Sequence, residues 1–319
     1  MQLVSLANNP VPSGAITGTF PGYDGAPLRF ARWEATRAPR RGTACLFPGR
    51  GEMIEKYFEV IAELRRRGFA VAIFEWRGQG GSARPLSDPA RGHVSSFSAY
   101  DRDLIRFMKD QVLPDCPPPY VAIAHSMGGN ILLRHASGPG SWFERMVLCS
   151  PMIEIANTRI KMPPWFARLY AEAACAIGLS GTYVPGGTST PIDTLPFEGN
   201  LLTSDRERYE RNKAILTAAP ELGLGSATKG WARAALRSCA AISAPDYPEQ
   251  IKIPALILSA SDDEMVSIPA IERFAAGLKV GTHIAMPGSR HEILQETDEV
   301  RRRFWAAFDA YLNIEQVAA

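Results

Sequence analysis

Short, wholly apolar runs alternate along the chain with segments in which apolar residues recur every three or four positions. Such runs predict buried strands, and the longer periodic segments predict amphipathic helices. The predicted strands span residues 44–47, 70–76, 120–124, 146–149, 255–259 and 283–286. The predicted helices span residues 55–67, 98–112, 127–136, 269–278 and 300–316. Buried strands separated by helices are typical of parallel sheets, so the pattern predicts an α/β fold with a mostly parallel, doubly wound sheet.

A hairpin is predicted ahead of this alternation. Residues 16–20 and 28–34 are both extended, and Pro21-Gly22-Tyr23-Asp24-Gly25 between them is rich in turn-forming residues. The sheet should therefore begin with two antiparallel strands.

A long interruption separates the fourth and fifth of the six predicted strands. Residues 151–250 contain no clear strand but carry helical patterns, such as 165–177 and 205–217, between Gly/Pro-rich loops. So long a segment is not a plain loop in a compact domain. We expect a helical cap over one edge of the sheet, inserted into a core made of residues 1–150 and 251–319.

Composition narrows the class of protein. The 319 residues are 46% hydrophobic and 21% charged, with 35 Lys and Arg against 33 Asp and Glu. This near-neutral balance argues against a dedicated nucleic-acid binder. The five cysteines form no C-x-x-C pair, which argues against a disulfide framework and a structural zinc site. No signal peptide or long apolar run is evident, so we expect a cytoplasmic protein, with contact to a membrane surface left open.

The strongest chemical motif is Ala124-His125-Ser126-Met127-Gly128-Gly129, which lies between a predicted strand and a predicted helix. A Ser at such a sharp turn has its hydroxyl lifted above the sheet, and the crowded turn needs the small residues Ala124 and Gly128 around it. We expect Ser126 to be a nucleophile and the N–H of Met127 to face a developing oxyanion. The alternative is a turn of small residues around a buried Ser.

A nucleophilic Ser needs a base, and an acid must orient that base. On this kind of sheet the three follow in the order Ser, acid, His, each on a loop after a strand. His291 is the His on a loop after a late strand, and Asp263 follows the strand predicted at 255–259. Asp262 is the alternative acid, because adjacent residues project differently and only one can reach His291.

The other histidines receive different expectations. His125 should point away from the Ser126 hydroxyl, and we retain it as a candidate substrate contact. His93 should fix its loop, with lining of the site as the alternative. His135 and His283 lie in a helix and a strand, where structural roles are expected.

A second oxyanion donor should come from the loop Phe47-Pro48-Gly49-Arg50-Gly51-Glu52, after the strand at 44–47. The N–H of Arg50 is the candidate, and Gly49 is a candidate substrate contact because glycine lets the backbone approach a ligand. The alternative is that these glycines only make a turn.

These motifs together resemble the α/β-hydrolases of the monoacylglycerol lipase and bacterial lysophospholipase group, which includes some aminopeptidase-like members. The resemblance runs from about residue 16 to residue 312. It rests on His-Ser-Met-Gly-Gly at Ser126, on Asp263 and His291, and on Pro48-Gly49-Arg50-Gly51-Glu52, Arg77-Gly78-Gln79-Gly80-Gly81-Ser82 and Arg91-Gly92-His93-Val94. It implies the α/β-hydrolase fold with an inserted cap, and Asp263 as the acid.

By this resemblance the chain is expected to be a serine hydrolase that cleaves carboxylic esters through a Ser-His-Asp triad and an acyl-enzyme. The leading substrates are lipid monoesters such as lysophospholipids and monoacylglycerols. No cofactor or metal is expected. The alternatives are a small-molecule carboxylesterase, thioesterase or peptidase with the same triad, and a catalytically inactive binding protein.

Three positions depart from the family pattern. Pro48 and Met53 stand where the family usually has His, and Glu75 stands where it usually has Asp. The first two put the hydrogen bonding of the oxyanion loop in question, whereas Glu75 is expected to be a change in the scaffold.

An apolar helical stripe in the cap segment includes Trp165, Phe166, Leu169 and Tyr170. Such a stripe is typical of packing against the main domain. The alternative is that these residues bind the acyl chain or touch a lipid surface.

Overall fold

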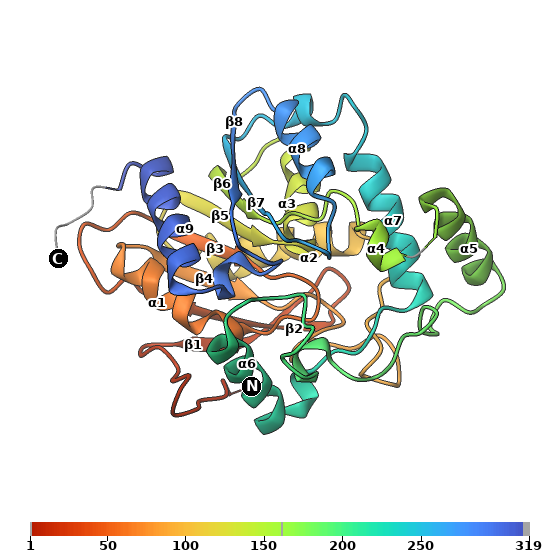
Figure 1. Cartoon of the computed structure of the whole chain (residues 1–319). Helices are drawn as coiled ribbons and strands as arrows, with labels where there is room; N and C mark the ends of the chain where they lie inside the picture. The colour runs from red at the N-terminus through yellow and green to blue at the C-terminus, as the bar shows by residue number, and fades with distance from the viewer. Residues whose placement is uncertain (1, 161, 315–319) are drawn as a thin grey trace.

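The computed structural model of the protein describes residues 2–160 and 162–314. Its centre is an eight-stranded sheet with the order β1-β2-β4-β3-β5-β6-β7-β8 (Figure 1). β1 pairs antiparallel with β2 and β2 with β4, and the remaining neighbours are parallel. The strands are β1 (Ile16–Pro21), β2 (Pro27–Trp33), β3 (Thr43–Phe47), β4 (Ala70–Phe74), β5 (Tyr120–His125), β6 (Phe143–Cys149), β7 (Ala255–Ala260) and β8 (Gly281–Met286). The predicted α/β class, hairpin and mostly parallel sheet are confirmed.

Alternate residues of the central strands feed two separate cores, because successive strand side chains point to opposite faces. Cys45 and Phe47 of β3 lie in the core that α2, α3, α7 and α8 cover, while Ala44 and Leu46 lie in the core that α1 and α9 cover. The helices packed on these faces are α1 (Phe58–Arg66), α2 (Ser98–Phe107), α3 (Met127–Ala136), α7 (Lys229–Ile242), α8 (Ile268–Ala276) and α9 (Asp298–Tyr311). The sheet is therefore a rigid, doubly covered platform for the loops at its edge.

The chain between β6 and β7, which we call the cap segment (residues 151–250), adds no strand to the sheet within the described residues. Its helices are α4 (Asn157–Ile160), α5 (Pro164–Ala176), α6 (Arg206–Ala218) and α7. Figure 1 shows α5 at the outer edge of the molecule beside α7, and α6 on another side, near the N-terminus. Every helix in the described part of the chain is too short or too polar to cross a lipid bilayer.

Several element ends differ from the sequence prediction. The strand expected to reach Trp76 ends at Phe74, and the helix expected over 98–112 continues past Phe107 as a π-helical turn, Met108–Val112. The helix expected over 300–316 ends at Tyr311, and residues 315 and 316 lie outside the described residues. Helix α7 was not predicted, because Ala, Ser and Cys make up much of its buried face and weaken its apolar periodicity.

Candidate active site

Ser126 occupies a strained turn between β5 and α3. Its φ of 50° and ψ of −115° place a non-glycine residue at positive φ, a conformation that costs free energy and persists only where the surroundings enforce it. Gly128 provides the room for the turn, since a Cβ there would lie 2.2 Å from the carbonyl oxygen of Phe47. The backbone carbonyl of Cys149 holds the turn by accepting a 3.0 Å hydrogen bond from the N–H of Ser126.

Ser126, His291 and Asp263 are joined by a continuous set of hydrogen bonds. The Nε2 atom of His291 lies 2.9 Å from Oγ of Ser126, and its Nδ1 atom lies 2.8 Å from Oδ2 of Asp263. Each residue follows a different strand, β5, β8 or β7, and all three are buried. An imidazole held between a hydroxyl and a carboxylate in this way can accept the hydroxyl proton while the carboxylate stabilises the resulting cation.

Asp263, and not its neighbour Asp262, faces His291. Oδ1 of Asp263 accepts hydrogen bonds from the backbone N–H groups of Met265 and Val266 at 2.8 and 3.1 Å, which leaves Oδ2 for the imidazole. Burial raises the pKa of Asp263, but the charge of His291 and these hydrogen bonds outweigh it, so the pKa lies below its ordinary value. Asp262 is exposed.

Three of the remaining histidines have partners away from Ser126. Nδ1 of His93 lies 2.8 Å from Oγ1 of Thr228 and ties the loop after β4 to the start of α7. His135 stacks on Trp142 at 5.6 Å, and Nε2 of His283 lies 2.8 Å from Oγ of Ser259. These contacts match the structural roles expected for them.

His125 takes part in a buried charge cluster beside His291. Its Nδ1 lies 3.0 Å from Oε1 of Glu52, and its Nε2 lies 3.1 Å from the carbonyl oxygen of His291. Burial lowers the pKa of His125, but the Glu52 carboxylate more than offsets this and holds that pKa above its ordinary value. The pKa of Glu52 lies far below its ordinary value, because the charge of His125 overcomes the effect of burial.

Lys56 extends this cluster. Its ammonium group lies 2.6 Å from Glu292, 3.0 Å from Asp193 and 3.7 Å from Glu52. Sequence reasoning missed the cluster, because its members come from four distant parts of the chain. The sequence did contain one signal. Because Glu292 directly follows His291, it must lie close to that residue.

The loop after β3 lies against the start of α3. The contact of Gly128 with Phe47 and Pro48 brings the two segments that carry the N–H groups of Met127 and Arg50 together. Within the described residues, neither of these N–H groups has a hydrogen-bond acceptor. The N–H of Gly49 donates instead to the carboxylate of Glu52, and a Cβ at Gly49 would lie 2.9 Å from Nδ1 of His125.

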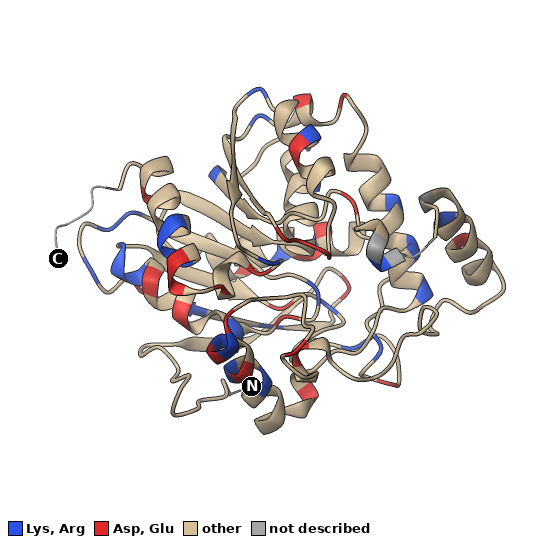
Figure 2. Ribbon diagram, viewed as in Figure 1, with Lys and Arg blue, Asp and Glu red and all other residues tan. Residues whose placement is uncertain are grey.

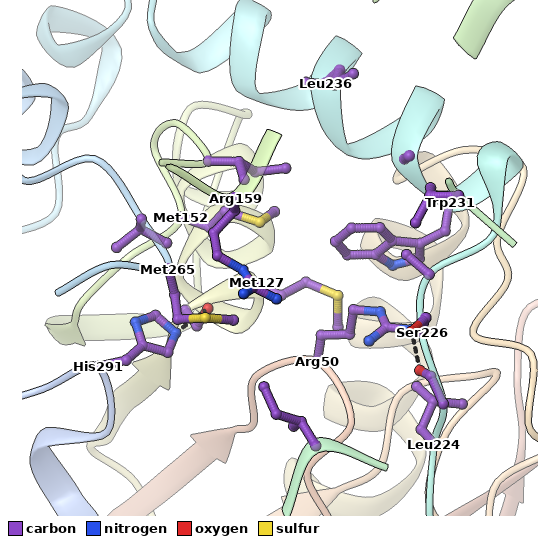
Figure 3. Close-up of a pocket in the computed structure, with 18 of the residues that line it drawn as sticks. Arg50, Met127, Met152, Arg159, Leu224, Ser226, Trp231, Leu236, Met265 and His291 are labelled. Atoms are coloured by element: carbon purple, nitrogen blue, oxygen red, sulfur yellow. Dashed lines mark hydrogen bonds between the residues drawn. The ribbon is translucent and has the colours of Figure 1, made fainter. Parts of the chain in front are cut away.

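Ser126 and His291 line a pocket of about 510 Å³. Figure 3 shows this pocket with His291 at its wall. Much of its wall is apolar and comes from both the sheet loops and the cap segment, including Met127, Met152, Ile155, Tyr170, Leu236 and Met265. Arg50, His125 and Glu52 also line it. The pocket can therefore hold an apolar chain next to a polar group beside the Ser126 hydroxyl.

We expected the apolar stripe of α5 to pack against the main domain. Instead, its large side chains are mostly exposed, and most of them lie outside the pocket. Trp165, Phe166 and Leu169 are 69%, 45% and 58% exposed, and none of them lines the pocket. Tyr170 does line it. The stripe expectation failed because α5 meets its neighbours through small residues, Ala167, Ala171 and Ala174, which are buried.

Two of the positions that depart from the family pattern have clear structural roles. Met53 is fully buried and packs against Ile215 and Leu216 of α6. Glu75 is buried and accepts a hydrogen bond of 2.9 Å from Arg29 and one of 3.0 Å from the N–H of Ile54. Burial raises the pKa of Glu75 to about 7.

The chain is similar to known hydrolases. The family model described as "Serine aminopeptidase, S33" matches residues 38–298. Lysophospholipase L2 from Escherichia coli is 35% identical over 293 residues, which cover 88% of this chain and 83% of the relative. Monoacylglycerol lipase from Mycolicibacterium smegmatis is 24% identical and covers 88% of this chain and 91% of that protein.

A solved structure of a monoglyceride lipase from Saccharomyces cerevisiae, in complex with a substrate analogue, has the same fold. It superimposes with a TM-score of 0.73 at 19% identity, covering 95% of this chain and 97% of that one.

Proposed function

Because the chain belongs to the serine aminopeptidase S33 family of α/β-hydrolases, in the group that contains lysophospholipases and monoacylglycerol lipases, we propose that it hydrolyses carboxylic esters of monoacyl lipids. The observation that carries the proposal is the unbroken contact from Ser126 through His291 to Asp263 at the floor of an apolar pocket.

In the proposed reaction, Oγ of Ser126 attacks the ester carbonyl while Nε2 of His291 takes the hydroxyl proton. The imidazolium, stabilised by Asp263, then gives that proton to the leaving alcohol, and an acyl-enzyme remains. His291 then deprotonates a water molecule, which attacks the acyl-enzyme. The resulting imidazolium gives that proton to Oγ of Ser126 as the fatty acid leaves. The N–H groups of Met127 and Arg50 hold the oxyanion in both halves, and one such donor contributes about 3–4 kcal/mol.

The form of the pocket supports a substrate with one acyl chain. Its apolar lining includes Met127, which follows Ser126 in the chain, and Leu236 of α7. A lysophospholipid or a monoacylglycerol has a single chain and a polar alcohol, which fits one apolar wall and one polar end. The names of the relatives include both kinds of lipase.

The exposed face of α5 supports contact between the cap segment and a lipid surface. Trp165, Phe166 and Leu169 stand on this face, and Arg168 and Glu172 are the charged residues of the helix, which Figure 2 shows largely without charge. Aromatic and aliphatic side chains on one helix face are suited to insertion at a bilayer interface. Such contact would bring the pocket close to membrane-borne substrate.

The test combines active-site labelling with a substrate panel. Purified protein should react with a fluorophosphonate at the peptide that contains Ser126, and Ser126→Ala should not react. Ser126→Ala should lose activity by about 10⁴-fold or more. The panel contains a lysophospholipid, a monoacylglycerol, p-nitrophenyl butyrate, an acyl thioester and an aminoacyl amide. Equal labelling of both proteins, or a turnover confined to the short ester, the thioester or the amide, would overturn the proposal.

A further inference from the structure

Four lysine and arginine side chains line the pocket that contains Ser126. They are Arg50, Lys56, Arg159 and Lys229. Lys56 is neutralised by its contacts with Asp193, Glu292 and Glu52. In residues 2–160 and 162–314, the other three have no carboxylate partner, and we call them the pocket cations (Arg50, Arg159 and Lys229).

The guanidinium of Arg50 is held in a prepared position. Its Nη2 atom donates a 2.8 Å hydrogen bond to the carbonyl oxygen of Gly225, and it lies over the ring of Trp231 at 5.1 Å. Gly92 leaves space for it, since a Cβ there would lie 2.1 Å from Nη2. This side chain is therefore positioned by the backbone and by an aromatic ring, and by no anion.

The charge of Arg50 is poorly solvated. Its Nε atom is buried and has no hydrogen-bond partner among the described residues. Burial lowers the pKa of Arg50 to about 10, so the side chain still carries its charge at neutral pH. A desolvated cation without a counter-ion attracts an anionic ligand more strongly than an exposed one does.

Arg159 and Lys229 add two charges to the same pocket from the cap segment. Arg159 lies in α4, and Figure 3 shows its side chain entering the pocket from the side opposite Arg50. Lys229 is the first residue of α7, and its ammonium group lies 5.9 Å from the ring of Tyr170. The pocket cations thus line the same pocket as Ser126.

We propose that the pocket cations form a subsite for the phosphate of the substrate's head group, with Arg50 as its main ligand. The inference rests on the proposed function and adds the residues that determine specificity for the head group of the substrate. Arg50 carries both the candidate oxyanion donor, which is its backbone N–H, and the guanidinium of this subsite. In a lysophospholipid the ester and the phosphate are separated only by glycerol carbons, so one residue can serve both groups. A monoacylglycerol has no charge to offer this subsite.

The experiment compares two substrates that share one acyl chain. 1-Myristoyl lysophosphatidylglycerol and 1-myristoylglycerol are presented in the same nonionic micelles at fixed ionic strength, and kcat/KM is measured for each. The wild-type protein should prefer the phospholipid by about tenfold or more. Arg50→Gln should reduce this preference by about 10–100-fold, as expected for loss of a hydrogen bond between charged groups. Arg159→Gln and Lys229→Gln should each reduce it several-fold.

Arg168→Gln is the matched control, because it removes one positive charge from the cap segment at an exposed position outside the pocket. It should leave the preference unchanged. A ratio of substrates cancels any general loss of activity, and labelling by a fluorophosphonate confirms a folded site in each variant. If the fluorophosphonate does not label Arg50→Gln, the substrate preferences of Arg159→Gln and Lys229→Gln decide whether the subsite exists.

A preference near unity in the wild-type protein, or an equal change in the Arg50 and Arg168 variants, would overturn the subsite. Activity in Ser126→Ala would instead overturn the proposed function. One further outcome would assign the subsite to the carboxylate of the released fatty acid. In that outcome, myristate inhibits p-nitrophenyl butyrate hydrolysis by the wild-type protein but not by Arg159→Gln. Glycerol 3-phosphate inhibits neither of these two proteins. That result would reject the phosphate assignment.

Discussion

The Nε2–H group of His125 donates a 3.1 Å hydrogen bond to the carbonyl oxygen of His291. Its other ring nitrogen lies 3.0 Å from the carboxylate of Glu52. Both partners are acceptors, and the Glu52 carboxylate holds the pKa of His125 above its ordinary value, so these contacts favour the charged ring, which donates from both nitrogens. His125 therefore holds the backbone of His291, and both of its hydrogen-bond partners are groups other than the Ser126 hydroxyl.

His125→Gln should lower kcat about tenfold and change KM little, because the loop that carries His291 loses a charge-assisted hydrogen bond. Steady-state kinetics with p-nitrophenyl butyrate measure this split. His135→Gln, which alters a histidine stacked on Trp142 away from the triad, should leave both constants near the wild-type values. A change in KM alone would argue against positioning.

Asp263→Asn should lower kcat by about 10⁴-fold, since the amide cannot stabilise the His291 cation or select its tautomer. Asp262→Asn removes a carboxylate one residue away, at an exposed position, and should have little effect. The pair is compared by burst and steady-state kinetics. Equal losses in the two variants would remove Asp263 from the proposed mechanism.

Gly128→Ala should destabilise the fold even though Gly128 lies in a helix, where Ala is normally favoured by about 1 kcal/mol. The added Cβ would lie 2.2 Å from the Phe47 carbonyl oxygen and 2.7 Å from that of Pro48. Overpacking of this kind costs about 1–3 kcal/mol, so the clash outweighs the helix propensity. Urea unfolding measures the difference, with Gly181→Ala, where the nearest atom is 3.5 Å from the new Cβ, as the control.

Glu292→Gln should flatten the pH dependence of stability. Burial and the nearby carboxylates raise the pKa of Glu292 to about 7, from 4.5. Between these values the folded protein keeps a proton that the unfolded chain has released, so the free energy of unfolding falls as pH rises from about 4.5 to 7. Over this whole pH range, the free energy of unfolding falls by about 3 kcal/mol.

Thermal unfolding at several pH values tests this slope. The wild-type Tm should fall more between pH 5 and 7 than the Tm of Glu292→Gln. Glu207→Gln alters an exposed carboxylate and should follow the wild-type curve. Parallel curves for the wild type and Glu292→Gln would contradict the prediction.

The double variant Trp165→Ser/Phe166→Ser should lose about tenfold of its activity on lysophospholipid in vesicles, because the exposed face of α5 would no longer enter the lipid interface. Hydrolysis of p-nitrophenyl butyrate in solution should be unaffected. Val280→Ser, at a position 49% exposed outside the cap segment, is the control. Unchanged activity on vesicles would exclude the contact.

The sequence was sufficient for the sheet, the turn at Ser126 and the order of Ser126, Asp263 and His291, because each depends on local patterns of apolar and small residues. It was not sufficient for the cluster around Lys56, whose charges meet only through folding. The side chain of Arg50 was missed for a similar reason. Its partners, Gly92, Gly225 and Trp231, lie far from it in the chain and carry no complementary charge.

The orientation of α5 also could not be predicted from the sequence. A stripe of large apolar residues predicts burial, but here Ala167, Ala171 and Ala174 form the buried side and the large residues face outward. Hydrophobic periodicity shows that a helix has two unlike faces, and it does not say which neighbour each face meets.

The triad follows β5, β7 and β8, while Arg159, Tyr170 and Lys229 enter the pocket from a single insertion between β6 and β7. In the proposed function, the insertion therefore contributes to selection of the leaving group and to none of the three groups that cleave the bond. Arg50 comes from the loop after β3, but Gly225 and Trp231, which hold its side chain, belong to the insertion. Replacing that one insertion with another of similar length is a direct route to new head-group preferences, with the chemistry of cleavage inherited intact.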